Sequence, residues 1–245
     1  ERIVEAADIP PGAEVLEVGP GLGSLTRHLA AAARRVVAVE LDARLLPALE
    51  EVLAGWENVT IVQGDILELN PAELMTQPEY LVVANIPYYI TSALIRHLLE
   101  AEKKPSRIVL TVQREVAERI TAGPGDLSLL ALSVQVYGAA RRSVRIPAGA
   151  FFPVPKVDSD AVRIDLYPRP LVPPDQINQF FRLTKAGFSQ KRKTLRNALS
   201  ASLRLSTADT EVMLRRAGID PMRRAETVSI EEWRALVDVY AEGKE

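Results

Sequence analysis

The segment Asn85-Ile86-Pro87-Tyr88 follows an apolar run at 80–84 and combines groups that suit a planar amino group. The Asn85 side-chain oxygen and the Ile86 carbonyl can each accept one hydrogen bond from the same exocyclic NH2. Pro87 fixes the backbone that aims this carbonyl, and Tyr88 offers a flat face for stacking. Two such acceptors localise the lone pair of an aromatic amine such as that of adenine, so that its nitrogen can attack an electrophile. A plain strand end followed by a proline turn is the alternative.

Three further predicted strands end in groups that suit a cofactor containing a nucleoside. The strand at 14–18 runs into a glycine turn, where the missing side chains let the backbone approach a ligand. Glu40 follows about 20 residues later, a position that suits two ribose hydroxyls. Asp65 can accept from an adenine amino group, with an aliphatic side chain on each face of the ring. The candidate cofactor-binding residues are Gly19, Gly21, Glu40, Leu41, Asp65, Ile66 and Asn85.

A nicotinamide site would use the same glycine turn and acidic residue. Against it, the chain shows no obvious constellation for hydride transfer. The two histidines, His28 and His97, lie far apart and are expected on helix surfaces.

Short β-branched runs alternate with helical patterns through residue 120, which predicts an α/β fold with a parallel sheet and helices on both faces. Strands are expected at 14–18, 35–39, 59–63, 80–84 and 107–113, and helices at 1–7, 24–34, 45–54, 92–100 and 115–121. Two alternating segments, 127–137 and 160–167, predict added and partly antiparallel strands. An N-terminal segment is expected to precede the first helix.

Four prolines at 168–174 predict a linker between two domains. Beyond it the pattern is helical, with helices expected at 176–187, 191–204, 207–217 and 230–240. Ser229 and Glu232 form a predicted capping box. The expected organisation is an α/β domain at 1–167 and a small all-α domain at 175–245.

The composition sets limits on the class of protein. Of 245 residues, 47% are hydrophobic, yet no apolar run reaches the length of a membrane span. The absence of cysteine excludes disulfides and thiolate metal sites and favours an intracellular protein. Residues 1–165 carry 16 basic and 22 acidic side chains, whereas 166–245 carry 14 and 10. A polyanion is therefore expected to prefer the second part.

Taken together, the motifs resemble those of the small-subunit ribosomal RNA adenine dimethyltransferase family. The matching segments are 15–26, 39–42, 64–67, 85–90, 151–159 (Phe-Phe-Pro-Val-Pro-Lys-Val-Asp-Ser) and 188–197 (Phe-Ser-Gln-Lys-Arg-Lys-Thr-Leu-Arg-Asn). The resemblance implies a Rossmann-like class I methyltransferase domain that uses S-adenosylmethionine (SAM). It implies dimethylation of N6 on two adjacent adenosines near the 3′ end of small-subunit rRNA, during ribosome biogenesis.

The resemblance also assigns roles to single residues. Gly19, Glu40, Asp65 and Asn85 would contact the cofactor. Asn85, Ile86 and Tyr88 would hold the target base, with Pro87 fixing the backbone and Phe151 covering the other face of the base. The protein is expected to act in the cytoplasm, as a monomer, on immature ribosomal subunits.

Residues 182–196 carry six basic and no acidic side chains. Contact with RNA phosphates is one reading of this segment and a solvated helix face is the other. Arg163 is a possible extension of the patch. The candidate RNA-binding residues are Lys156, Lys185, Lys191, Arg192, Lys193 and Arg196.

Three other functions remain open from the sequence. A large-subunit rRNA adenine dimethyltransferase of the antibiotic-resistance type shares the Asn-Ile-Pro-Tyr motif and the proline-rich loop. A DNA adenine methyltransferase is disfavoured because its motif usually has proline, or an equivalent, in place of Ile86. A ribosome-assembly factor that works mainly without catalysis is the non-enzymatic alternative.

Overall fold

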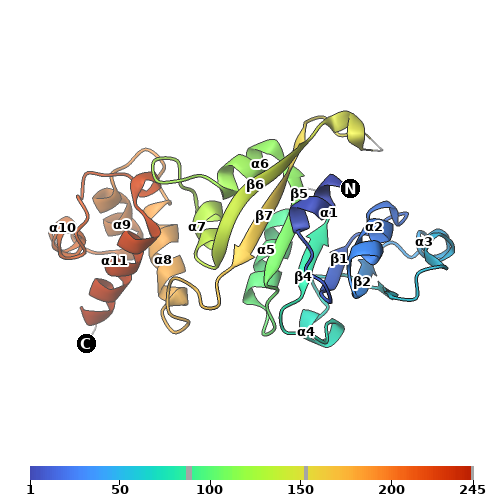
Figure 1. Ribbon diagram of the computed structural model, residues 1–245. Coiled ribbons are helices and arrows are strands. Elements are labelled where there is room, and N and C mark those ends of the chain that lie inside the picture. Colours follow the sequence, from blue (N-terminus) through green and yellow to red (C-terminus); the bar gives the residue numbers. More distant parts are fainter. Residues whose placement is uncertain (87–89, 152–153, 244–245) are drawn as a thin grey trace. The chain divides into compact units, whose positions relative to one another are not determined.

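The structure is a computed structural model that describes residues 1–86, 90–151 and 154–243 (Figure 1). The chain divides into two compact units. The first contains Glu1–Glu118 and Gly138–Leu166, and the second contains Arg119–Tyr137 and Tyr167–Glu245.

The first unit is built on a seven-stranded sheet of order β3-β2-β1-β4-β5-β7-β6. Its strands are β1 (Glu14–Val18), β2 (Arg35–Glu40), β3 (Val59–Gln63), β4 (Leu81–Ala84), β5 (Arg107–Gln113), β6 (Gly138–Ile146) and β7 (Ser159–Leu166). Neighbours among β1 to β5 pair in parallel, whereas β7 runs antiparallel to both β5 and β6. The predicted α/β class, with a parallel sheet and added antiparallel strands, is confirmed.

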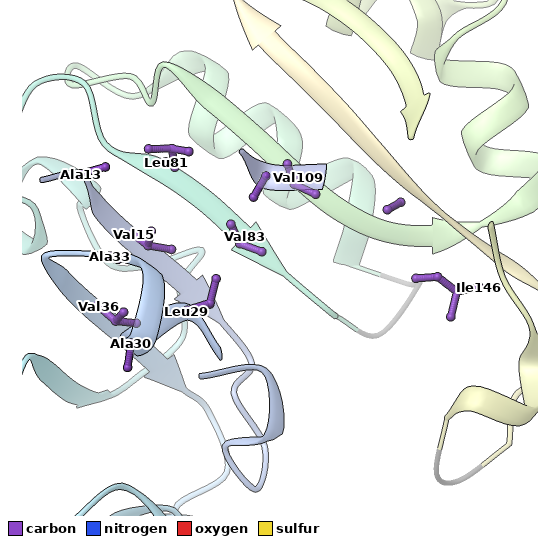
Figure 2. Packing of buried hydrophobic residues seen from close by; sticks show 12 residues of the cluster. Ala13, Val15, Leu29, Ala30, Ala33, Val36, Leu81, Val83, Val109 and Ile146 are labelled. Atoms are coloured by element: carbon purple, nitrogen blue, oxygen red, sulfur yellow. The ribbon is translucent and has the colours of Figure 1, made fainter. Parts of the chain in front are cut away.

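Alternating side chains of the central strands form one face of the core. Val15, Val83 and Val109 belong to a buried cluster that Leu29 joins from helix α2 (Ser24–Ala32) (Figure 2). Residues of helix α1 (Arg2–Ala7) pack against the same cluster. The remaining helices of this unit are α3 (Leu46–Leu53), α4 (Pro71–Leu74), α5 (Thr91–Glu100), the first residues of α6 (Arg114–Ile120) and the 3-10 turn η2 (Ala148–Ala150).

The second unit is helical, as expected for the C-terminal part. It contains α7 (Leu129–Gln135), α8 (Ile177–Gly187), α9 (Leu195–Leu203), α10 (Thr207–Arg216), the 3-10 turn η3 (Ala225–Thr227) and α11 (Ile230–Glu242). Ser229 and Glu232 form the predicted capping box at the start of α11. Gly187 lets α8 approach α11, because a Cβ at this position would lie 2.5 Å from the Trp233 ring.

The strand predicted at 127–137 is wrong, since this segment forms helix α7. Ser128 caps the helix by accepting a hydrogen bond from the Ala131 N–H at 3.2 Å. The carbonyl of Glu226 accepts from the N–H groups of Gly125 and Leu127, which ties the segment to the second unit. The predicted boundary near residue 168 therefore misses residues 119–137, which cluster with the helices.

Candidate active site

The carboxyl ends of four parallel strands bring the predicted cofactor residues to one edge of the sheet. Val18 pairs with Val39 on one side and with Ala84 on the other. Gly19, Glu40 and Asn85 are the next residues along β1, β2 and β4. Ligands of open α/β sheets bind at this edge, so the predicted clustering of these strand ends is observed.

The glycine turn lies beside the segment that begins at Asn85. The Gly19 N–H donates to the Val39 carbonyl at 2.9 Å, which fixes the start of the turn against β2. Gly19 has a φ of 70°, a conformation that other residues rarely adopt. A Cβ on Gly19 would meet the Ile86 Cγ2 at 3.9 Å, which places these two strand ends in contact range.

Glu40 holds the glycine turn and the following turn through its two oxygens. Oε2 accepts from the Gly21 N–H at 3.0 Å, and Oε1 accepts from the Asp42 N–H at 2.9 Å. The residue is 6% exposed. A carboxylate offers about four lone-pair sites, so each oxygen keeps one for a hydroxyl group. This arrangement fits two ribose hydroxyls.

Asp65 lies at the end of the neighbouring strand. The Gly64 N–H donates to the Glu40 carbonyl at 3.0 Å, so this strand end is joined to that of β2. Asp65 Oδ1 accepts from the Leu67 N–H at 2.9 Å, which fixes the turn but leaves Oδ2 for a ligand. Leu41 is exposed and Ile66 is buried, so the two side chains predicted to flank the adenine ring differ in exposure.

Glu17 is a buried acid that no sequence pattern marked as a site residue. It is 1% exposed, and neither of its oxygens has a hydrogen-bond partner among the described residues. Burial raises the pKa of Glu17 to about 7, and the charge of Glu40 adds to this shift. In the sequence, only its position two residues before Gly19 indicates that Glu17 lies near the cofactor site.

The candidate base-binding residues are placed in part. Asn85 is exposed, which suits a side chain that contacts a ligand. Ile86 is buried, which suits a residue that anchors the backbone and offers only its carbonyl. Phe151 is partly buried and packs against the core cluster that contains Ile146. Pro87 and Tyr88 lie outside the described residues, so their roles stay predictions.

The middle of the basic segment, at 191–193, is a turn rather than the start of a helix. Lys191, Arg192 and Lys193 are exposed between α8 and α9, and α9 begins only at Leu195. The prediction of a helix from residue 191 is therefore wrong at its first turn. The Lys193 N–H donates to the Gln190 carbonyl at 3.0 Å, which closes the turn.

The other candidate RNA-binding residues differ in their surroundings. Lys156 and Lys185 are exposed, whereas Arg196 pairs with Glu211 at 3.0 Å. Arg163 was expected to extend the basic patch, but it is only 8% exposed. It donates to Asp165 at 2.9 Å and to the Ala6 carbonyl at 3.2 Å, so it holds α1 against the sheet.

The His97 Nε2–H donates a hydrogen bond to the Leu69 carbonyl at 2.9 Å, which accounts for it as a structural residue. Within the described part of the chain, the helices are too short or too polar for any of them to cross a bilayer.

Comparisons with known proteins show the family of this chain. The Ribosomal RNA adenine dimethylase family profile matches residues 1–242. The chain is 47% identical over 242 residues to ribosomal RNA small subunit methyltransferase A of Dehalococcoides mccartyi, covering 98% of this chain and 83% of the relative. The enzyme of the same name from Bacillus cytotoxicus is 42% identical, covering 96% of this chain and 84% of the relative.

Two solved structures share the fold over nearly the whole chain. The 23S rRNA methyltransferase ErmE superimposes with a TM-score of 0.77 at 32% identity, covering 97% of this chain and 95% of that one. A dimethyladenosine transferase from Plasmodium falciparum gives a TM-score of 0.81 at 24% identity, covering 99% and 95%. The chain therefore belongs to the ribosomal RNA adenine dimethylase family.

Proposed function

We propose that this protein transfers methyl groups from SAM to N6 of two adjacent adenosines near the 3′ end of small-subunit rRNA, dimethylating each. One observation carries the proposal: Asn85 follows β4 at the same sheet edge as Glu40, with the Gly19 turn against Ile86. A cofactor held by the glycine turn and Glu40 would thus lie beside the group that receives the amine.

The residues at this edge fit SAM, which supplies an electrophilic sulfonium methyl group when bound. Glu40 would accept from the ribose hydroxyls and Asp65 from the adenine amino group of the cofactor. Gly19 and Gly21 would let the methionine part approach the backbone. Because the methyl donor is already reactive, the protein chiefly positions the two reactants.

The Asn85 side-chain oxygen and the Ile86 carbonyl would accept hydrogen bonds from the two N–H groups of the target adenine. This pulls the amino nitrogen toward tetrahedral geometry and exposes its lone pair to the methyl group. The base must first leave its stack, at a cost of a few kcal/mol, which stacking on Tyr88 and Phe151 would offset. A general base is not needed, because the methylated ammonium group is acidic and loses its proton readily.

The second methyl transfer places a further demand on the site. After the first transfer the amino nitrogen keeps one N–H group, so one of the two acceptors loses its partner. The pocket must then tolerate a methyl group where an N–H group had pointed.

The small subunit is favoured over the large subunit as substrate by the degree of similarity. Identity reaches 47% with a small-subunit enzyme and 32% with a large-subunit one, over similar shares of this chain. The exposed basic turn at 191–193 would contact RNA phosphates and thereby position the substrate. Action on ribosomal subunits implies the cytoplasm, and we expect the protein to work there as a monomer.

The test is incubation of the protein with radiolabelled SAM and purified, unmodified small subunits, with large subunits as the control. We expect label in small-subunit rRNA only, on two adjacent adenosines, with up to two methyl groups on each. Label confined to the large subunit would establish the rival substrate. Absence of label from both would refute the proposed reaction.

A further inference from the structure

A β-bulge in the edge strand β6 brings two arginines onto one face of the sheet. Arg142 pairs with Val162 and Arg145 pairs with Asp160, with Ser143 as the extra residue between them. Side chains alternate along a regular strand, so residues three apart would otherwise face opposite sides. The bulge shifts this alternation and puts both arginines on the face that Val162 and Asp160 share.

A third arginine joins them from the end of β5. Arg114 is the first residue of α6, and its Nε donates to Glu118 at 3.0 Å. The same Glu118 oxygen accepts from Arg142 at 3.3 Å. Together these groups form a pocket of about 350 Å³, which we call the arginine pocket. It is lined by Arg114, Arg142, Ser143, Val144, Arg145 and Asp160.

The arginines keep donors for a ligand after their ion pairs are counted. Arg142 also approaches Asp160 at 3.5 Å, and Arg145 pairs with Asp158 at 2.7 Å. Within the described residues, each arginine side chain donates its hydrogen bonds from one nitrogen only. The donor is Nε in Arg114, Nη1 in Arg142 and Nη2 in Arg145. A guanidinium has five N–H donors on three nitrogens, and these side chains are about half exposed.

The arginine pocket lies at the edge of the sheet that carries the candidate active site. Ala84 pairs with Leu110, Leu110 with Val162, and Val162 with Arg142. Arg142 therefore stands in the same cross-strand row as the residue that precedes Asn85. Three strand spacings separate them, or about 14 Å. A nucleic acid with one base at Asn85 would have its neighbouring backbone within reach of the pocket.

We propose that the arginine pocket binds a phosphodiester group of the RNA whose adenosine is methylated, close to the target nucleotide. The inference rests on the proposed function. Planar guanidinium forks match phosphate oxygens in pairs, and such contacts fix the register of a strand without reading its sequence. Glu118, Asp158 and Asp160 hold the three guanidinium groups in place before the phosphate arrives, which lowers the cost of ordering them.

The edge strand itself supplies a matched control. Arg141 is the neighbour of Arg142 and pairs with Arg163, on the opposite face of the sheet. It is also exposed and also paired with an acid, Asp165, at 3.6 Å. Binding to unmodified small subunits is measured over a series of salt concentrations for the Arg142→Gln/Arg145→Gln double variant, for Arg141→Gln and for the unaltered protein.

We expect the double variant to bind small subunits at least about tenfold more weakly. The slope of the logarithm of the binding constant against the logarithm of the salt concentration should be smaller by about 0.7 to 0.9 for each phosphate that the variant no longer binds. Arg141→Gln should retain both values. Thermal unfolding and the SAM dissociation constant should match those of the unaltered protein in both variants. The proposal is overturned by an unchanged slope in the double variant, by an equal loss in Arg141→Gln, or by a loss that follows thermal stability.

The two proposals fail in different ways. If the unaltered protein does not methylate small subunits, the proposed function is wrong. If it methylates them while the double variant keeps its affinity and salt slope, only the phosphate site in the arginine pocket is wrong.

Discussion

The carboxylate of Glu40 accepts a hydrogen bond from the Gly21 N–H at 3.0 Å, across 19 residues of sequence. Its other oxygen accepts from the Asp42 N–H at 2.9 Å. One side chain at the end of β2 thus shapes both the glycine turn of β1 and its own following turn. The geometry of the cofactor site depends on this carboxylate even before a ligand binds.

Replacing Glu40 with glutamine should weaken SAM binding. The amide has one oxygen, so its NH2 group would face one of the two backbone N–H donors and could not accept from a ribose hydroxyl. Loss of charge-assisted hydrogen bonds predicts a dissociation constant about 10 to 100 times higher, measured by titration calorimetry. Glu50→Gln, on the exposed side of α3, is the control. An unchanged constant in Glu40→Gln would remove the residue from the site.

Replacing Asn85 with alanine should slow methyl transfer with little effect on folding. The side chain is exposed, so the midpoint of thermal unfolding should stay close to that of the unaltered protein. The loss of one positioned polar group predicts a single-turnover rate about 100-fold lower at saturating SAM. A variant that methylates small subunits at a near-normal rate would show that the amine is held elsewhere.

Sequence patterns located β1, β2, β4 and β5 because most of their side chains are buried. The strand predicted at 107–113 matches β5 and that at 14–18 matches β1. The error at 127–137 has a local cause. Its alternating leucines and valines resemble a strand, but the Ser128 cap and packing within the helical unit override that preference. The true strand, β6, is rich in alanine and arginine and carried no clear pattern.

The candidate site was predictable where residues lie at or just beyond the carboxyl end of a strand, as Glu40, Asp65 and Asn85 do. Three-dimensional neighbours were not predictable. Arg163 looked like a surface cation, yet it donates to Asp8, 155 residues earlier in the chain. Likewise, Arg142 and Arg145 share a face of the sheet only because of a β-bulge, which the sequence does not predict.

Glu17 should make the stability of the protein depend on pH. Its pKa of about 7 in the folded protein exceeds the ordinary 4.5, so the folded state binds more protons between these values. Stability from this group is therefore full below about pH 4.5 and is lost as pH rises toward 7. Glu17→Gln removes the titration. The unfolding midpoint of the variant, relative to that of the unaltered protein, should rise from pH 4.5 to 7 and then level off. Parallel curves would contradict the shifted pKa.

Arg163 should contribute to stability and not to RNA binding. Although burial raises the pKa of Asp165, hydrogen bonds from Arg163 and Arg107 hold it below the usual value, so these charges are coupled. Arg163→Gln should lower the free energy of unfolding by roughly 2–3 kcal/mol, less than for a fully buried pair because Asp165 is partly exposed. Denaturant unfolding measures this, with the exposed Arg169→Gln as control. If Arg163→Gln instead reduced the salt slope of RNA binding without destabilising the protein, Arg163 would belong to the RNA-binding patch.

The basic turn at 191–193 should contribute to RNA binding through its position and not only through net charge. Lys191→Glu/Arg192→Glu should weaken binding to unmodified small subunits and reduce its salt slope, because fewer counterions are released when fewer phosphates are neutralised. The control, Arg169→Glu/Arg234→Glu, changes the charge of the same unit equally at exposed positions. It should have a smaller effect, because both of its arginines lie outside the basic turn. Equal losses in the two double variants would mean that only the overall charge of the helical unit matters.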